Sequence, residues 1–265
     1  MSTTTDFYDA LAPYYHLIFE DWNASIERQA EALHAVIRAE LGGGGGTVLD
    51  LACGIGTQSL GLAALGYRVT ASDISASAVR RLRDEAARRG VAIDATVADM
   101  RAAWDAHGRE FDVVLCADNA LPHLLTDDDI LVALRQFLRC TAPGGACLVT
   151  IRDYEATPMQ DARVHSHGVR QEDGARWVVF QVWDPRPPLY QISMYMVEDR
   201  GGGVAVGLDA AYQVRGPLNV VAGVGRMKMD EVTVGVLPFM LAQLVVMFVM
   251  VLFPQTVLAP LRWFY

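Results

Sequence analysis

Short apolar runs alternate with amphipathic stretches from about residue 47 to residue 151. The runs are typical of buried strands, whereas the stretches between them place apolar side chains at helical spacing. Gly90 and the segment Pro143-Gly144-Gly145 end two of the predicted helices. The predicted strands are Thr47–Leu51, Tyr67–Ala71, Ala92–Val97, Phe111–Ala117 and Ala146–Ile151, and the predicted helices begin near Thr57, at Ala76 and at Asp127, with Thr126 as a cap. This alternation predicts an α/β fold with a parallel, doubly wound sheet.

The segments on either side of this alternation have different patterns. Residues 25–41 predict a helix that has Asn23 or Ser25 as its N-cap and ends at the glycine run 42–46. Residues 6–22 are aromatic and apolar with a few acids, which fits either a helix pair packed on the sheet or a lid over a ligand. After residue 156 the alternation stops, and short strands separated by turns predict an antiparallel insert at 176–183, 189–198 and roughly 203–214.

Residues 47–58, TVLDLACGIGTQ, predict a strand, a glycine turn and the start of a helix. That order places backbone N–H groups and the positive end of a helix against a ligand. Residue 59 is a serine, so the third glycine of the dinucleotide-binding pattern G-x-G-x-x-G is missing. Two acids make the pattern more specific. Asp50 lies four residues before Gly54, and Asp73 ends the next apolar run, YRVTASD, where a ribose-binding carboxylate belongs.

The patterns D-x-A-C-G-x-G and V-T-A-S-D resemble those of the class I S-adenosylmethionine (SAM) dependent methyltransferases. This resemblance implies a Rossmann-like fold that binds SAM, with a nicotinamide-binding domain as the less favoured alternative. It implies that Gly54 and Gly56 let the backbone approach the amino-acid part of SAM and that Asp73 accepts both ribose hydroxyls. Asp99 and Met100 would lie beside the adenine. The implied cofactor-binding residues are Asp50, Ala52, Gly54, Gly56, Asp73, Ile74, Asp99, Met100, Ala117 and Asn119.

Other stretches narrow the resemblance to glycine and sarcosine N-methyltransferases, over about residues 6–200. CADNALPHLL carries the Asn and the His-Leu of those enzymes, and IRDY carries their Arg-x-Tyr. YDALAPYY matches a stretch with which methyltransferases of this type often begin and which closes over SAM. The resemblance implies methyl transfer to the amine of a small amino acid. Such a transfer gains chiefly from alignment and exclusion of water, so no strong base is required when the amine binds neutral. The candidate catalytic residues are Tyr15, Asn119, His123, Arg152 and Tyr154.

Several of these residues also have structural interpretations. Asp73 fits a turn or helix-cap position, and His123 fits a half-buried structural histidine. Arg152 has two neighbouring acids, Asp153 and Glu155, as ion-pair partners. For the whole chain, the alternatives are a methyltransferase for an unrelated small metabolite and a non-catalytic SAM-binding protein tethered to a membrane by its tail.

Composition narrows the class of protein further. The net charge of −9 argues against a broad nucleic-acid surface. The partner that the resemblance implies is a small-molecule methyl acceptor. The four cysteines form no C-x-x-C pair, so no metal site is predicted, and they fit a reduced, cytoplasmic compartment. The sequence MSTTTDFYDA has neither the basic nor the apolar region of a signal peptide.

The last fifty residues depart from the family pattern. Residues 1–200 carry 18 Arg and 28 acidic residues, whereas residues 201–265 carry four basic and three acidic residues. Residues 232–261 contain no charge, and from about Gly216 the sequence loosely resembles the end of the large permease subunit of TRAP-type transporters. Three interpretations stay open: a membrane anchor through residues 232–265, a buried apolar C-terminal helix, or a fused or frame-shifted end without function.

The expected domain organisation follows from these patterns. It comprises an N-terminal helical lid at 1–41, a SAM-binding core at 42–155, a substrate-covering insert at 156–215 and an atypical hydrophobic tail at 216–265.

Overall fold

The computed structural model describes residues 3–43, 46–152, 161–201 and 204–215. The chain divides into two compact units, Met1–Val224 and Gly225–Tyr265, and the second unit lies wholly outside the described residues. The predictions for the tail, including the apolar helix and the membrane contact, therefore fall outside them, as does Tyr154. Within the described ranges, no helix is both long and apolar enough to cross a membrane.

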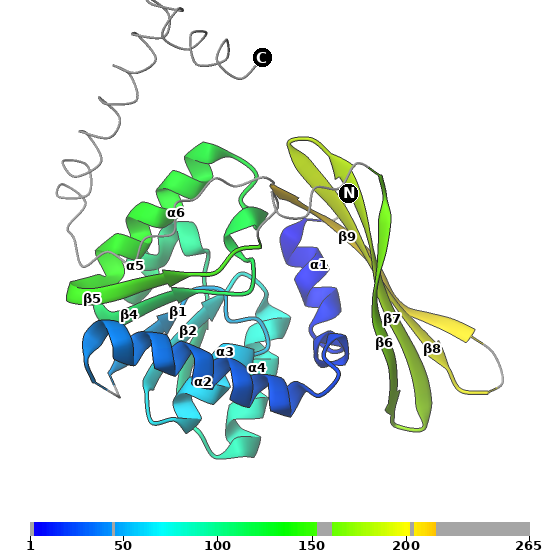
Figure 1. The fold of residues 1–265 in the computed structure, drawn as a ribbon, viewed down its shortest axis with the longest axis horizontal. Helices are drawn as coiled ribbons and strands as arrows, with labels where there is room; N and C mark the ends of the chain where they lie inside the picture. Colours follow the sequence, from blue (N-terminus) through cyan, green and yellow to red (C-terminus); the bar gives the residue numbers. More distant parts are fainter. Residues whose placement is uncertain (1–2, 44–45, 153–160, 202–203, 216–265) are drawn as a thin grey trace, which may run out of the picture. The chain divides into compact units, whose positions relative to one another are not determined.

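A five-stranded parallel sheet forms the centre of the first unit, in the order β3-β2-β1-β4-β5 (Figure 1). Val48 at the centre of this sheet pairs with Val69 on one side and with Val113 on the other. The order reverses between β1 and β4, and ligands bind at such a switch point in parallel α/β sheets. The five strands are β1 (Thr47–Asp50), β2 (Arg68–Asp73), β3 (Ile93–Val97), β4 (Phe111–Cys116) and β5 (Thr141–Val149).

Helices cover both faces of this sheet, as the alternation predicted. One face packs against side chains of α2 (Trp22–Leu41), α3 (Thr57–Ala64) and α4 (Ala76–Arg89), which include Ile26, Leu60 and Leu82. The other face packs against α5 (Ala103–His107) and α6 (Asp127–Cys140), where Phe137 is fully buried. Burying a side chain of that size contributes about 1.5–3 kcal/mol. A doubly wound α/β core is therefore confirmed.

The caps explain where several helices begin. Thr126 accepts a hydrogen bond from the backbone N–H of Asp129, as predicted for α6, and Ser75 caps α4 in the same way. The prediction for α2 was wrong. That helix begins at Trp22 because Asp21 is its N-cap and accepts from the backbone N–H of Ala24.

The start of β5 also differs from the prediction. The strand begins at Thr141, which pairs with Phe111, and it continues through Pro143-Gly144-Gly145 with a shift of register. Proline and glycine were expected to separate α6 from the strand. An edge strand tolerates both residues at a bulge, because only one side of it must pair.

A second sheet follows in sequence, with four antiparallel strands in the order β6-β7-β8-β9. The antiparallel insert is therefore confirmed, but its first strand was missed because RVHSHGVRQE is polar and lacks a clear alternation. β7 also runs through Pro185 and ends at Arg186, beyond the predicted end of this strand at residue 183. The strands are β6 (Arg163–Glu172), β7 (Ala175–Arg186), β8 (Leu189–Asp199) and β9 (Val204–Arg215).

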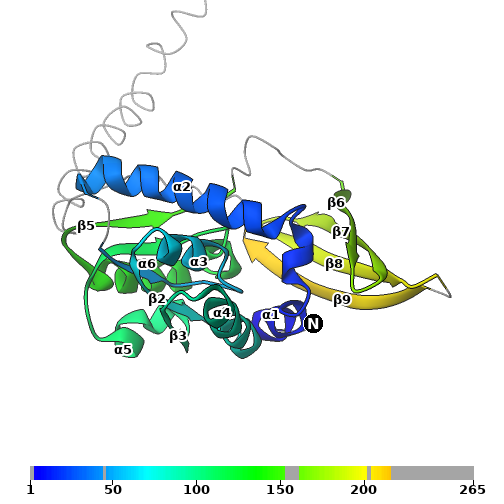
Figure 2. The ribbon, with the colours of Figure 1, turned by 90° about the horizontal axis from the view of Figure 1, so that it is seen from below.

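The N-terminal segment lies between the two sheets, as Figures 1 and 2 both show for α1 (Thr4–Leu11). Phe7 and Leu11 pack against an apolar cluster of the antiparallel sheet that includes Trp177 and Met194. On its other side, α1 contacts the start of α4, where Asp9 accepts hydrogen bonds from Ser75 and Ser77. A short 3₁₀ helix, η1 (Tyr15–Ile18), continues the segment. This position brings its tyrosines to the carboxyl ends of the parallel strands.

Candidate active site

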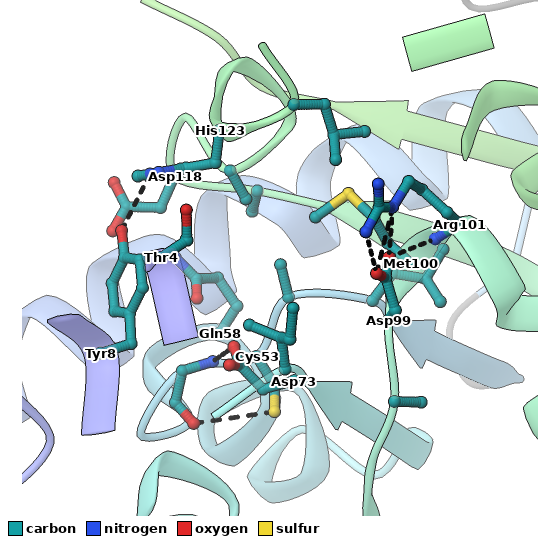
Figure 3. A pocket seen from close by; sticks show the side chains of 18 of the residues that line it. Thr4, Tyr8, Cys53, Gln58, Asp73, Asp99, Met100, Arg101, Asp118 and His123 are labelled. Carbon is teal, nitrogen blue, oxygen red and sulfur yellow. Dashed lines mark hydrogen bonds and ion pairs between the residues drawn. The ribbon is translucent and has the colours of Figure 1, made fainter. Parts of the chain in front are cut away.

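A cavity of about 330 Å³ opens at the carboxyl ends of β1 to β4. Its wall comes from the loops after these strands, with Tyr8 of α1 and Tyr15 of η1 closing one side. Figure 3 shows Asp118, His123 and Tyr8 at one end of the cavity and Asp99, Met100 and Arg101 at the other. The predicted residues that line it are Tyr15, Ala52, Gly54, Asp73, Ile74, Asp99, Met100, Ala117 and His123.

Asp73 lies in the cavity wall at the end of β2 and fixes the loop after β1. Its Oδ2 accepts the backbone N–H of Gly54 at 2.8 Å, and its Oδ1 accepts that of Ser75 at 2.8 Å. Burial raises the pKa of Asp73, although these backbone hydrogen bonds oppose the rise. An ionised carboxylate has about four lone-pair sites, so Asp73 keeps acceptor capacity toward the cavity.

The two glycines of the turn have different surroundings. Gly54 lines the cavity at φ +52°, and a Cβ there would lie 3.2 Å from Cε1 of Tyr15. Gly56 does not line it. It caps α3 at φ +99°, and a Cβ would lie 2.3 Å from Cδ1 of Leu82. Gly54 therefore leaves space at the cavity, whereas Gly56 is required by core packing.

Asp50, at the end of β1, is buried and does not line the cavity. Its Oδ2 accepts a hydrogen bond of 2.6 Å from Oγ of Ser59, and burial raises its pKa to about 6. Ser59 is the residue that replaces the third glycine of the dinucleotide pattern. Ser59 therefore has a structural role, because it donates a hydrogen bond to a buried carboxyl group.

Asp99 forms an ion pair that was not predicted. The guanidinium of Arg101 donates to Oδ2 of Asp99 at 2.6 Å and to Oδ1 of Asp129 at 2.8 Å. Burial alone would raise the pKa of Asp99, but the hydrogen bonds from Arg101 hold it below its usual range. Arg101 thus fixes an acid at the cavity end farthest from His123, and the spacing Asp-x-Arg was the only signal for it in the sequence.

A second cavity, of about 440 Å³, adjoins the first. It includes Asn119 and Arg152, and its apolar part includes Trp183 of the antiparallel sheet. The guanidinium carbon of Arg152 lies 4.6 Å from the ring centroid of Trp183, and Oδ1 of Asn119 accepts the backbone N–H of Arg152 at 3.0 Å. Among the described residues Arg152 makes no ion pair. Its expected partners Asp153 and Glu155 lie outside them.

Four side chains line both cavities: Tyr8, Tyr15, Asp118 and His123. We call this set the junction. The backbone beneath it is unusual, because Asp118 and Asn119 have φ of 55° and 62°, in the left-handed region. For residues other than glycine, such conformations cost about 1–3 kcal/mol each. Thr150 of the neighbouring segment holds the turn, accepting the backbone N–H of Asp118 at 2.8 Å through its Oγ1.

His123 is a neutral member of the junction. Its Nε2 lies 2.9 Å from the hydroxyl of Tyr8, and burial lowers its pKa from 6.5 to about 4. The ring is therefore uncharged at neutral pH and takes part in hydrogen bonding rather than in ion pairing. This geometry is compatible with both interpretations of His123, as a structural histidine and as a candidate site residue. Its hydrogen bond to α1 is structural, and it lies at the boundary of both cavities.

The lowered pKa of His123 predicts an effect of pH on stability. The unfolded chain binds the extra proton between about pH 6.5 and pH 4, so the free energy of unfolding must fall as pH falls through this window. In His123→Gln, whose side chain stays neutral, the free energy of unfolding should fall by about 1–2 kcal/mol less than in the wild type over that interval. The difference is smaller than the full pKa shift would give, because the ring lies at a cavity wall. Urea unfolding at pH 7 and pH 4.5 measures the difference. Parallel losses in the two proteins would show that His123 titrates normally.

Comparison with known proteins gives the site a family context. Residues 48–145 match a family described as "Methyltransferase domain". A glycine/sarcosine N-methyltransferase of Parasynechococcus marenigrum (strain WH8102) is 30% identical over 136 residues, which cover 51% of this chain and 47% of that protein. A cypemycin N-terminal methyltransferase of a Streptomyces species is 34% identical over 110 residues, 41% of this chain and 43% of that protein. The chain thus spans about half the length of these curated relatives.

A solved structure shows the same fold. SAM-bound CalS10, an amino pentose methyltransferase from Micromonospora echinaspora, matches with a TM-score of 0.63 at 19% identity, over 77% of this chain and 80% of that one. The resemblance of the tail to a transporter subunit is not shown by these comparisons and stays a prediction. Together with the cavity at the carboxyl ends of the parallel strands, the findings show that residues 48–145 match a methyltransferase domain and that the chain shares its fold with the SAM-bound methyltransferase CalS10.

Proposed function

We propose that this chain transfers a methyl group from SAM to the amine of a small molecule that carries a carboxylate, with glycine and sarcosine as the first candidates. The observation that carries this proposal is the pair of cavities with a shared junction. One cavity contains most of the predicted cofactor residues, and the other contains Arg152 and Asn119. A methyl donor and an acceptor bound in adjoining cavities would meet at the junction. The glycine/sarcosine N-methyltransferase relative supports this acceptor class.

The residues of the first cavity fit SAM. Its volume falls within the range of about 300–1,000 Å³ that is usual for small-molecule sites. Asp73 keeps free acceptor sites for ribose hydroxyls, and Gly54 leaves the space in which backbone and ligand can approach. Asp99 and Met100 would hold the adenine at the opposite end. When bound, SAM supplies a methyl group made electrophilic by the adjacent sulfonium charge.

The residues of the second cavity would align the acceptor. Arg152 presents a guanidinium whose fork geometry suits a carboxylate, and the ring of Trp183 holds it from one side. Asn119 fixes the backbone at Arg152. Tyr8 and Tyr15, as members of the junction, would exclude water from the reacting groups. Alignment and exclusion of water are the two contributions that this reaction needs most.

A larger amine is the second candidate acceptor. The second cavity of about 440 Å³ has far more space than glycine needs, and part of its wall is apolar. Such a wall favours an acceptor that carries an apolar body beside its polar groups. The apolar residues in that wall include Phe7, Leu11, Ile18, Ile151, Trp183 and Met194.

A panel assay tests the proposal. Full-length protein is incubated with SAM carrying a ¹³C-labelled methyl group and with glycine, sarcosine, larger amino acids, amino sugars and the corresponding carboxamides. We expect labelled N-methyl products from acids and little from carboxamides. Products from amino sugars alone would contradict the carboxylate anchor. SAM binding without any product would leave a binding protein and would contradict the proposed activity.

The contact between Asp9 and α4 should slow the dissociation of the cofactor. Asp9 Oδ1 accepts from Oγ of Ser75 at 2.6 Å and from the backbone N–H of Ser77 at 2.9 Å, and the first of these bonds is the main reason that its pKa is lowered. Asp9→Asn should weaken this charge-assisted contact by about 1 kcal/mol and speed dissociation of S-adenosylhomocysteine about five-fold. Stopped-flow displacement measures the rate. Asp84→Asn, an exposed change on α4, is the matched control. Equal rates in both variants would show that α1 does not retain the cofactor.

A further inference from the structure

We propose that Asp118 binds the acceptor's amine as an ammonium ion and removes its proton before methyl transfer, so that the site selects zwitterions. This inference rests on the proposed function and adds a residue that the sequence resemblance did not assign. It also gives the acceptor a chemical class, a molecule with a cationic amine and an anionic carboxylate.

The position of Asp118 is the first argument. Its side chain lies at the junction and borders both cavities, beside the hydroxyl of Tyr8 and the ring of His123 (Figure 3). The other three members of the junction are two phenols and a histidine that is neutral at neutral pH. Asp118 is therefore the junction residue that can carry a negative charge where donor and acceptor meet.

The rigidity of this position is the second argument. The left-handed φ of 55° at Asp118 directs the side chain, and Thr150 holds its backbone N–H at 2.8 Å. A strained conformation that is held by its neighbours is typical of functional sites. Asparagine adopts the left-handed region as readily as aspartate does, so Asp118→Asn removes the charge and preserves the backbone.

The surroundings of Asp118 suit a proton acceptor. The side chain is exposed to the cavity, but protein encloses it on the other sides, and this enclosure raises its pKa, with a hydrogen bond from Tyr15 opposing the rise. A carboxyl group with a raised pKa is a stronger base. The other titratable or charged groups that line the two cavities are Tyr8, Cys53, Asp73, Asp99, Arg101, His123, Asp129, Arg152 and His167.

The proton and electron balance of the step is simple. The ammonium nitrogen gives one N–H proton to a carboxylate oxygen of Asp118, which leaves a neutral amine and a neutral carboxyl group. The freed lone pair forms the new N–C bond, and the electron pair of the broken C–S bond stays on sulfur. The methylated nitrogen carries the positive charge that sulfur loses, and Asp118 returns its proton to solvent after product release.

The positive charge of Arg152 in the second cavity, together with the negative charge of Asp118, explains why the site should select zwitterions. Arg152 lies in that cavity with Asp118, and an amino acid carries a complementary charge at each end. An alcohol or a carboxamide would leave one of these two groups without its partner. Leaving a charged group unpaired is costly, so both should be rejected.

Calorimetry with sarcosine tests the inference independently of turnover. Full-length protein saturated with S-adenosylhomocysteine is titrated with sarcosine, and with acetate as a probe that has no amine. Asp118→Asn should weaken sarcosine binding about ten-fold and leave acetate binding and S-adenosylhomocysteine binding within two-fold of wild type. Asp128→Asn, which removes an exposed charge from the first turn of α6, is the matched control. Equal sarcosine affinity in wild type and Asp118→Asn, or no sarcosine binding by the wild type, would overturn the inference.

A pH profile distinguishes a proton acceptor from a structural residue. At pH 7, kcat/KM for sarcosine should fall about ten-fold in Asp118→Asn and recover as pH rises toward the pKa of the free amine. A loss that stays constant with pH would assign Asp118 a structural role. Full activity in Asp118→Asn contradicts this inference alone, whereas a wild type that methylates no amine contradicts the proposed function.

Discussion

Replacement of Asp73 by alanine should weaken SAM binding roughly 100-fold. Charge-assisted hydrogen bonds contribute about 1.5–3 kcal/mol each, and we propose that the carboxylate accepts both ribose hydroxyls. A loss of about 2.7 kcal/mol corresponds to 100-fold in affinity. Calorimetric titration of SAM into both proteins measures the effect. The wild type should bind SAM and should not bind NAD.

The loop contacts of Asp73 require a control. Its carboxylate also accepts the backbone N–H groups of Gly54 and Ser75, so the alanine variant loosens the turn as well as the ribose contact. Asp73→Asn keeps the size of the side chain and one acceptor oxygen, and should lose less affinity than Asp73→Ala. Thermal unfolding of each variant reports on the turn separately. Unchanged SAM affinity in Asp73→Ala would remove this residue from the cofactor site.

Replacement of Arg152 by lysine should lower kcat/KM for an amino-acid acceptor about ten-fold or more. Lysine keeps the positive charge but loses the bidentate fork and the stacking on Trp183. Arg152→Ala, which also removes the charge, should lose more. SAM affinity should change little, because Arg152 belongs to the second cavity and not to the first. This pattern separates acceptor alignment from cofactor binding.

A paired assay gives the decisive comparison for Arg152. Methyl transfer to sarcosine and to its carboxamide is measured in wild type and in Arg152→Lys, with SAM affinity determined alongside. The preference for the acid over the carboxamide should shrink in the variant. If the wild type methylates both compounds equally well, or if the variant keeps full activity, Arg152 has a structural role and the acceptor is not held by a carboxylate.

Local sequence signals predicted the parallel part of the fold. The apolar runs, the cap Thr126 and the glycine turn after β1 all act through neighbouring residues, so a single sequence contains them. The start of α2 was misplaced because several polar residues there can cap a helix, and tertiary packing decides between them. β6 was missed because a polar edge strand is recognised by its pairing with β7 rather than by its own pattern.

The site was predicted in part for the same reason. Residues at or just after the ends of strands, such as Asp73 and Asp99, fall at the cavity because strand ends determine their place. The contribution of Trp183 to the second cavity depends on how the antiparallel sheet packs, and no local pattern contains that information. Asp118 was passed over for Asn119, although both follow β4, because only the backbone conformation shows which of them faces the junction.

An experimental structure of the full chain with S-adenosylhomocysteine and sarcosine is the most direct test of the account. We expect the ribose at Asp73, the adenine beside Asp99 and Met100, and the sulfur at the junction of Tyr8, Tyr15, Asp118 and His123. The amine of sarcosine should then contact Asp118, and its carboxylate should contact Arg152. A sulfur atom directed away from the junction, or sarcosine bound outside the second cavity, would contradict the central claim that donor and acceptor meet there.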